Sequence, residues 1–359
     1  MSKSMSKYLS RKIKFISVFA MFSIVFVNAY NYSEPLTPTS HIKYGFNFFP
    51  MFEYFFSNGL FSFAVPMFFI FSGFLFFLKY QNTRFCYLSK LKKRGYTLLI
   101  PYVLWSVISG AAILILNQFD NFKNLPFFKE NAVDISRCYI YLIKPPAFQL
   151  WFFRQLMLLA VLSPLIYILI KYTKAFILIP FGILWAFNLS YIIDTSGLFF
   201  FSIGAAFAIF GKARNVTRRD NKGISALLCA AWLLLSASLM LLAASKSPLK
   251  PLMMAIYKLN EVVGIAALWF VFDHIVKLIN HKKGMLLASA HLFFVYALHE
   301  PLLDISNQLA LIPDNSHSSH FVLYICLPIS VIAMCVILSM MIRKLFRPLH
   351  SVLTGGRNN

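Results

Sequence analysis

Charged residues are scarce in this chain of 359 residues, and acidic residues are the scarcest of them. Asp, Glu, Lys and Arg together make up 13% of the sequence, and only 12 residues are acidic. Because a soluble domain averages about 25% charged residues, a soluble globular protein is excluded. The 34 basic residues give a formal net charge of +22. They lie in short clusters between apolar runs, which is typical of membrane proteins, so no nucleic-acid partner is expected.

Paired cysteines and the motifs of soluble enzymes are also missing. The five Cys contain no Cys-x-x-Cys pair, so neither a disulfide framework nor a zinc site is predicted, and no metal is expected. The sequence has no P-loop, no GxGxxG and no HExxH. The basic N-terminus leads into an apolar run without a small-residue cleavage site. This run is therefore predicted to be a retained first span rather than a signal peptide.

Long hydrophobic runs are what the sequence does contain. Hydrophobic residues make up 59% of the chain, including 40 Phe and 17 Tyr. Several runs reach about 20 residues, the length that crosses about 30 Å of hydrocarbon. The sequence therefore predicts an all-α integral membrane protein with about ten transmembrane helices. The expected spans are residues 14–31, 56–79, 96–116, 150–170, 174–192, 196–211, 223–244, 252–276, 286–306 and 320–342.

The basic clusters fall in alternate connections between these spans. With ten spans, six basic segments lie on one side and most acidic residues lie on the other, so the positive-inside rule predicts that both termini are cytoplasmic. We expect one polytopic domain over residues 1–348, followed by a short basic cytoplasmic tail over 349–359. The connection at 117–149 is polar and aromatic, and is expected to hold an interfacial helix or a lid.

Ionisable residues inside spans are costly and usually face a bundle interior or a wet cavity. His299 and Glu300 lie in "HLFFVYALHEPLL". His299 is suited to proton transfer near neutral pH, or it is an interfacial residue at a helix end. The adjacent Glu300 points about 100° away on a helix. Arg154 in "FQLWFFRQLM" could extend to the interface, or bind an anion or a sugar hydroxyl.

Small and acidic residues interrupt two other spans. Ser72 and Gly73 in "VPMFFIFSGFLFF" could line a ligand passage, or make a close contact between helices. Glu261 and the pair Asp273 and His274 lie in the eighth span or at its inner end. For these acidic residues, buried pairing with a cation is the preferred interpretation.

A basic cluster precedes the third span. Lys92, Lys93 and Arg94 lie in "KLKKRGYTLLIPYVLW". They either anchor the span by the positive-inside rule or form a docking site for a polyanionic cytoplasmic ligand, since phosphates suit Lys and Arg.

Five segments, taken in chain order, resemble the bacterial integral-membrane acyltransferases of type 3, which include O-acetyltransferases of surface polysaccharides. They extend from residue 11 to about residue 305, close to the whole membrane region. The segments are "RKIKFISVFAMFSIVFVNAYN", "VPMFFIFSGFLFF", "KLKKRGYTLLIPYVLW", "QLWFFRQLMLLAVLSPLIY" and "FFVYALHEPLL".

The resemblance implies an O-acyltransferase in the bacterial cytoplasmic (inner) membrane. Acetyl-CoA would dock at the cytoplasmic side, and its acyl group would pass to a hydroxyl of a cell-surface glycan or of its lipid-linked precursor. Membrane lipid surrounds such a protein. The implied sites are Lys92, Lys93 and Arg94 for acyl-CoA, Ser72 and Gly73 for the passage, Trp151, Arg154 and Tyr296 for the acceptor, and Asn28, His299 and Glu300 for catalysis.

The first span departs from the pattern that the resemblance implies. Asn28 stands where members of the family usually carry a His taken to be essential, and Ser17 stands where a cation is usual. Lys14 lies one turn earlier, and Thr97 replaces the second Arg of an RxxR-type pair. An Asn amide takes up no proton near neutral pH. Another base such as His299 could act, the chain could be a degenerate relative, or Asn28 could be an inactivating substitution.

A different class of function is also open, namely a glycan or lipid transporter, or a scaffold in a glycan-synthesis complex. The missing His favours this class, and the basic cluster disfavours it. Transporters often show related halves with broken helices, and no such internal repeat is visible in the sequence.

Overall fold

The chain folds as a bundle of helices, and no strand occurs within the residues described. The computed structural model describes residues 5–30, 37–116, 118–119, 148–189, 193–211, 221–279, 283–309 and 317–356. The helices are α1 Lys7–Asn28, α2 Phe48–Tyr54, α3 Ala64–Phe77, α4 Arg84–Arg94, α5 Ile100–Leu116, α8 Trp151–Val161, α9 Ser163–Thr173, α10 Leu178–Ala186, α11 Thr195–Phe210, α12 Lys222–Ala244, α13 Lys250–Ile279, α14 Lys283–Leu309, α15 His317–Leu345 and α16 Arg347–Leu353.

Six helical stretches among the described residues are long and apolar enough to cross a membrane: Phe48–Phe77, Arg84–Ala112, Ser163–Ala186, Lys222–Ala244, Lys250–Val276 and Ser318–Leu345. Two shorter apolar helices cover Phe148–Val161 and Thr195–Phe210. The all-helical prediction is confirmed, whereas the count of ten spans and the cytoplasmic termini stay predictions. The lid or interfacial helix expected at 117–149 falls almost wholly outside the described residues.

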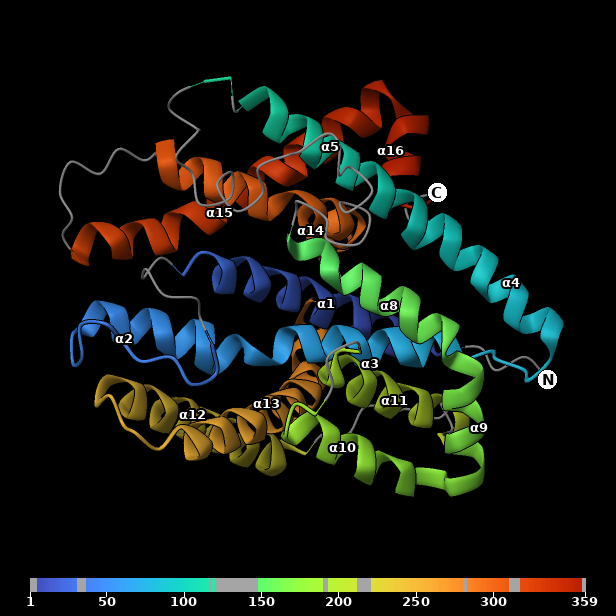
Figure 1. Cartoon of the computed structure of the whole chain (residues 1–359), viewed down its shortest axis with the longest axis horizontal. Coiled ribbons are helices and arrows are strands. Elements are labelled where there is room, and N and C mark those ends of the chain that lie inside the picture. Colours follow the sequence, from blue (N-terminus) through green and yellow to red (C-terminus); the bar gives the residue numbers. More distant parts are fainter. Residues whose placement is uncertain are drawn as a thin grey trace.

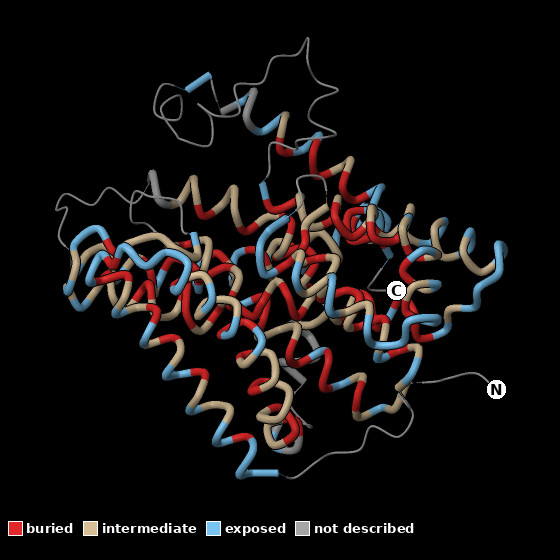
Figure 2. Tube along the Cα trace, turned by 60° about the horizontal axis from the view of Figure 1, so that its bottom comes forward, coloured by how far each residue is buried: buried red, intermediate tan, exposed pale blue. Residues whose placement is uncertain are grey.

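The long helices run side by side in three tiers (Figure 1). In that view α5, α14, α15 and α16 lie above, α1, α3 and α8 lie in the middle, and α10, α11, α12 and α13 lie below. Buried residues gather along the centre of the bundle, and exposed ones lie on its outer faces and at its ends (Figure 2).

The outer faces are apolar, as a lipid-facing surface requires. On α12, Leu227, Leu234 and Leu241 are exposed at intervals of seven residues. Residues seven apart lie on one face of a helix, two turns from each other. Ser238, on the same face, turns its hydroxyl to the Leu234 carbonyl at 2.8 Å, so this stripe is mainly apolar, as expected of a helix that faces hydrocarbon.

Two predicted spans are longer than expected. Helix α2 continues through a π-helical turn at Phe55–Gly59 and a 3-10 turn at Leu60–Phe63 into α3. Likewise, α4 continues through a π-helical turn at Gly95–Leu99 into α5. The basic cluster therefore lies on a helix that continues into the third span, and not in a loop before it.

The predicted fourth span, in contrast, is two helices. Helix α8 ends at Val161 and α9 begins at Ser163, and Figure 1 shows that their axes run in different directions. Pro164 lies in the first turn of α9, where its missing N–H costs no helical hydrogen bond. Lys174 has a φ of +57° and separates α9 from α10.

Helix α1 is tied to α13 by a buried ion pair. Nζ of Lys12 lies 2.5 Å from Oδ1 of Asp273 and 3.8 Å from the centroid of the Trp269 ring. The Tyr8 hydroxyl donates to the same carboxylate oxygen. The buried cation predicted for Asp273 is thus confirmed, while neighbouring His274 contacts the Ser225 hydroxyl at 3.3 Å.

The C-terminal residues fold against the bundle as α16, and the boundary expected between 348 and 349 falls inside that helix. His350 is buried, and its Nε2 lies 2.9 Å from Oγ of Ser339 on α15. That hydroxyl is 2.7 Å from Nδ1 of His291 on α14. Nε1 of Trp105 on α5 donates to the Leu353 carbonyl at 3.2 Å. Three long helices therefore hold α16 in place.

Candidate functional site

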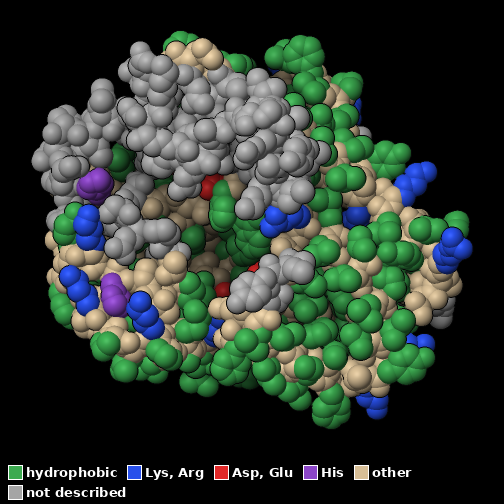
Figure 3. All heavy atoms as spheres, in the orientation of Figure 1, with side chains coloured by type: hydrophobic (Ala, Val, Ile, Leu, Met, Phe, Trp, Pro, Cys, Tyr) green, Lys and Arg blue, Asp and Glu red, His purple; other side chains and the backbone are tan. Residues whose placement is uncertain are grey.

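A large cavity runs through the middle of the bundle. Its volume is about 790 Å³, and α1, α3, α8, α13 and α14 supply most of its wall. The space-filling view shows the bundle hollowed at its centre, with acidic and basic side chains visible at the rim (Figure 3). Such a cavity, mostly apolar and with a few polar groups, is the usual form of a small-molecule site.

Asn28 lies on the cavity wall, at the last residue of α1. Its Nδ2 is 2.9 Å from Nε2 of His299 on α14. The structure therefore joins two of the three residues that were predicted as catalytic, Asn28 and His299. His299 itself is completely buried and does not line the cavity.

The partners of His299 fix its protonation. Nδ1 lies 2.9 Å from the Tyr296 carbonyl and 3.1 Å from the Val295 carbonyl. Because carbonyls only accept, Nδ1 carries the proton. Nε2 then holds the lone pair, which accepts the hydrogen bond from the Asn28 amide. Both ring nitrogens are occupied, so His299 has no lone pair to offer to a substrate in this arrangement.

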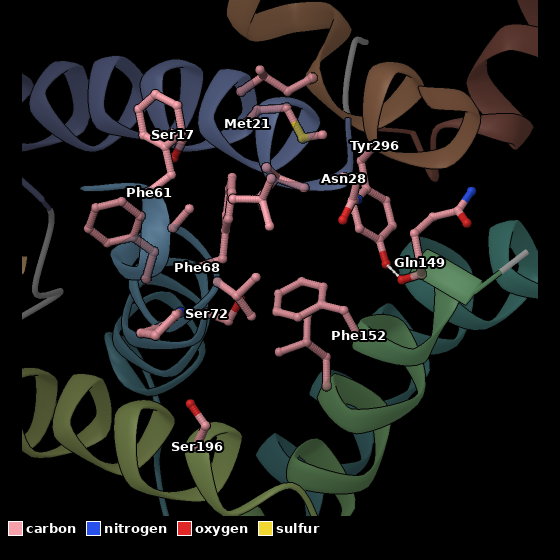
Figure 4. A pocket seen from close by; sticks show the side chains of 18 of the residues that line it. Ser17, Met21, Asn28, Phe61, Phe68, Ser72, Gln149, Phe152, Ser196 and Tyr296 are labelled. Atoms are coloured by element: carbon pink, nitrogen blue, oxygen red, sulfur yellow. Dashed lines mark hydrogen bonds between the residues drawn. The ribbon is translucent and has the colours of Figure 1, made fainter. Parts of the chain in front are cut away.

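Gln149 links the start of α8 to α14, a role that was not predicted from the sequence. Its backbone N–H donates to Oε2 of Glu300 at 3.0 Å, and its side-chain Nε2 donates to the Ala297 carbonyl at 2.8 Å. The Tyr296 hydroxyl donates to the Gln149 carbonyl, as the dashed line in Figure 4 marks. Glu300 therefore holds Gln149 and not His299. Only the position of Gln149 just before the "LWFF" segment could have drawn attention to it.

Two cations, Lys14 and Arg94, line the cavity. The Arg94 guanidinium lies 5.5 Å from the centroid of the Phe76 ring. Lys92 and Lys93 are exposed and are not part of the cavity wall. Of the three residues predicted for acyl-CoA, the structure therefore brings Arg94 alone to the cavity, and it adds Lys14 from α1.

Ser72 and Gly73 have different surroundings. Ser72 lines the cavity, as Figure 4 shows. Gly73 faces α11 instead, where an added Cβ would lie 2.0 Å from the Phe201 carbonyl oxygen. Gly204 makes the reciprocal contact with the Ile70 carbonyl oxygen, also at 2.0 Å. Gly73 is thus a helix-packing residue, as small residues commonly are in membrane bundles.

The predicted acceptor residues are divided in the same way. Trp151 and Tyr296 line the cavity. Arg154 is half-buried and does not line it.

Other polar residues also line the cavity. They are Tyr257 and Glu261 of α13 and Ser196 at the start of α11. In Figure 4, Ser196 lies on the far side from Asn28, Tyr296 and Gln149, with Phe68, Ser72 and Phe152 between them. Residues four apart share a helix face, so the spacing of Tyr257 and Glu261 places both toward the cavity. The sequence had predicted only a buried structural pair for Glu261.

Comparisons with known proteins agree with the sequence pattern. Residues 12–343 match the model of a family described as an acyltransferase domain. The chain is 27% identical to the succinoglycan biosynthesis protein ExoH of Rhizobium meliloti (strain 1021), over 98% of this chain and 94% of that protein. No solved structure matches.

Proposed function

This chain belongs to the integral-membrane acyltransferases of type 3, and we propose that it moves an acetyl group from cytoplasmic acetyl-CoA to a hydroxyl of a cell-surface glycan or of its lipid-linked precursor. We further propose that it acts in the bacterial cytoplasmic membrane, with ten spans and both termini on the cytoplasmic side. The similarity to a succinoglycan biosynthesis protein supports a polysaccharide acceptor.

The observation that carries this proposal is the composition of the cavity wall. One part of the wall is cationic, at Lys14 and Arg94, and another is hydrogen-bonding, around Asn28 and Tyr296. Aromatic side chains and Ser72 also line the cavity. A donor with anionic phosphates and a neutral acyl arm needs this combination, because phosphates pair with cations and the arm with apolar surface.

The residues present fit acetyl-CoA as the donor. Lys14 and Arg94 are joined to no carboxylate within the part of the chain that the structure describes, so both charges are available to phosphate oxygens. Acetyl-CoA would supply a thioester, whose carbonyl carbon accepts the attacking hydroxyl oxygen.

Transfer of labelled acetyl groups tests the proposal. The purified protein in detergent is given radiolabelled acetyl-CoA, together with a polysaccharide extract of the producing bacterium. We expect saturable binding of the donor and label in the polysaccharide fraction. Binding without release or transfer of acetyl would contradict catalysis, and the absence of binding would favour a transporter.

One observation favours a second candidate, a relative that binds the donor without turnover. Asn28 occupies the position of the usual His, and it also holds the lone pair of His299. If no other base were available, transfer would be slower by about 10²–10⁴-fold, the usual contribution of general base catalysis.

A further inference from the structure

Glu261 differs from the other buried acids described in the structure because it lines the cavity. Its side chain is 5% exposed, and its Oε2 is buried without a hydrogen-bond partner. Burying a carboxylate without hydrogen bonds is costly.

The other acids near the cavity are already engaged. Asp194 caps α11, where its Oδ2 accepts from the Gly197 N–H at 2.5 Å. Glu300 accepts from Gln149, and Asp273 pairs with Lys12. Glu53 is fully buried with both oxygens unpartnered, but it does not line the cavity. Among the described residues, Glu261 is therefore the acidic residue that lines the cavity and is joined to no cation.

The imidazoles do not offer a better proton acceptor. His299 has both ring nitrogens occupied. His291 and His350 are connected through Ser339, and neither lines the cavity. Asn28 lines the cavity but has no basic atom.

Lys258 and Tyr257 shape the surroundings of Glu261. Lys258 lies three residues earlier on α13, and so on the same side of the helix. No ion pair within 4.0 Å joins them in the described chain, and Nζ of Lys258 lies 4.9 Å from the centroid of the Trp185 ring. Lys258 therefore forms no ion pair that would cover the Glu261 oxygens. Tyr257 supplies a hydroxyl on the same wall.

We propose that Glu261 is the base that activates the acceptor hydroxyl, in the role that Asn28 cannot perform; this inference rests on the proposed acyl transfer. A Glu261 oxygen takes the hydroxyl proton while the hydroxyl oxygen bonds to the thioester carbonyl carbon. The carbon–sulfur bond breaks, and coenzyme A leaves as a thiolate. The proton on Glu261 then passes to that thiolate, so the products are the sugar ester and the free thiol.

Two substitutions of similar size separate catalysis from stability. Glu261→Gln keeps the volume and removes the basic oxygen, so kcat for acetyl transfer should fall by about 10²–10⁴-fold. The KM for acetyl-CoA and the thermal midpoint should stay near those of the unsubstituted protein. Glu53→Gln is the matched control, because it changes a buried unpartnered Glu outside the cavity wall. It should leave kcat unchanged.

The outcomes distinguish the two proposals. If the unsubstituted protein transfers acetyl and Glu261→Gln keeps its kcat, Glu261 is not the base. If the substitution raises only the KM for the acceptor, Glu261 binds the sugar without taking its proton, which also overturns the proposal. If the unsubstituted protein neither binds nor transfers acetyl, the proposed function itself fails. Should Glu261→Gln not fold, Glu261→Asp, which keeps a carboxylate, must retain more kcat than Glu261→Ala.

Discussion

The side-chain amide of Asn28 donates a hydrogen bond to Nε2 of His299 at 2.9 Å, and this contact fixes which atoms at the site can act as bases. The Asn28 amide occupies the lone pair on Nε2 of His299, and His299 lies behind the cavity wall. The pair therefore orders this part of the wall, and proton transfer is left to another group.

The first prediction concerns the energy of this pair. Asn28→Leu removes the donor and leaves a buried acceptor on His299, which should cost about 1–3 kcal/mol of stability. The double variant with His299→Leu should lose less than the sum of the two single variants, because each partner is needed for the same hydrogen bond. Thermal unfolding in detergent measures all three. Strictly additive losses would show that the contact carries no coupling energy.

Asn28→His tests whether position 28 is a vacant base. Because Glu261 is proposed to act already, we expect the substitution to change kcat by less than about tenfold. Acetyl transfer by purified protein is the measurement, with Asn28→Gln as a control that keeps an amide. A gain of about 10²–10⁴-fold would mean that the natural protein lacks a base, which would contradict the role of Glu261.

Arg94 and Lys92 lie two residues apart but should differ in their effect on donor binding. Arg94 lines the cavity, and Lys92 is exposed outside it. Removing a charge-assisted hydrogen bond costs about 1.5–3 kcal/mol. Arg94→Gln should therefore weaken acetyl-CoA binding by about tenfold or more, and Lys92→Gln by much less. Titration calorimetry gives both affinities, and equal losses would place donor binding on the exposed surface.

Gly73 and Gly110 form a matched pair for helix packing. A Cβ at Gly73 would lie 2.0 Å from a backbone oxygen of α11, whereas a Cβ at Gly110 would meet nothing within 4 Å. Gly73→Ala should lower stability by about 1–3 kcal/mol through overpacking. Gly110→Ala should be neutral or slightly stabilising, since Ala favours a helix. If Gly73→Ala unfolds at the same temperature as Gly110→Ala, the close approach of α3 and α11 is wrong.

The docking of α16 should weaken in acid. Burial, and then the charge of Arg343, lower the pKa of His350 in the folded protein. The undocked segment therefore binds the proton more readily. Docking is at full strength above the ordinary pKa of about 6.5 and loses up to about 1.4 kcal/mol per pH unit as the pH falls below it.

Hydrogen exchange of the α16 amides at about pH 5 and about pH 7.5, corrected for intrinsic rates, measures this effect. His291 faces the same Ser339 hydroxyl, so the comparison uses His350→Gln, which removes one of the two titrating groups. The substitution should reduce the pH dependence. Equal protection of α16 at both pH values in the unsubstituted protein would contradict the prediction.

Much of the fold could be predicted because apolar runs and charge clusters are local signals. The apolar run that contains Ser72 predicted a helix, and the motifs in chain order predicted the family. The motifs also indicated Asn28 and His299, although nothing in the sequence showed that their side chains would touch. Contacts of this kind depend on how distant helices pack, and periodicity within one helix does not encode that.

The misplaced expectations have the same cause. Ser72 and Gly73 are neighbours on one helix, yet one faces the cavity and the other faces α11. Lys92, Lys93 and Arg94 look alike as a cluster, but only rotation about α4 decides which of them reaches the cavity. Pro164 is typical of the first turn of a helix, and α9 does begin there, inside the predicted fourth span. Because the residues on both sides are apolar, the whole run was predicted as a single span.

Helix α1 has consequences for the order of assembly. Its two ends depend on partners far along the chain, since Lys12 and Asp273 are 261 positions apart and Asn28 and His299 are 271 apart. At a synthesis rate of about 5–20 residues per second, the first helix waits roughly 13–55 seconds for these partners. During that interval Lys12 has no counter-ion and the cavity has no α14 wall. The helix that is made first thus depends on residues made near the end of the chain, and a chain truncated before α14 lacks that wall of the cavity.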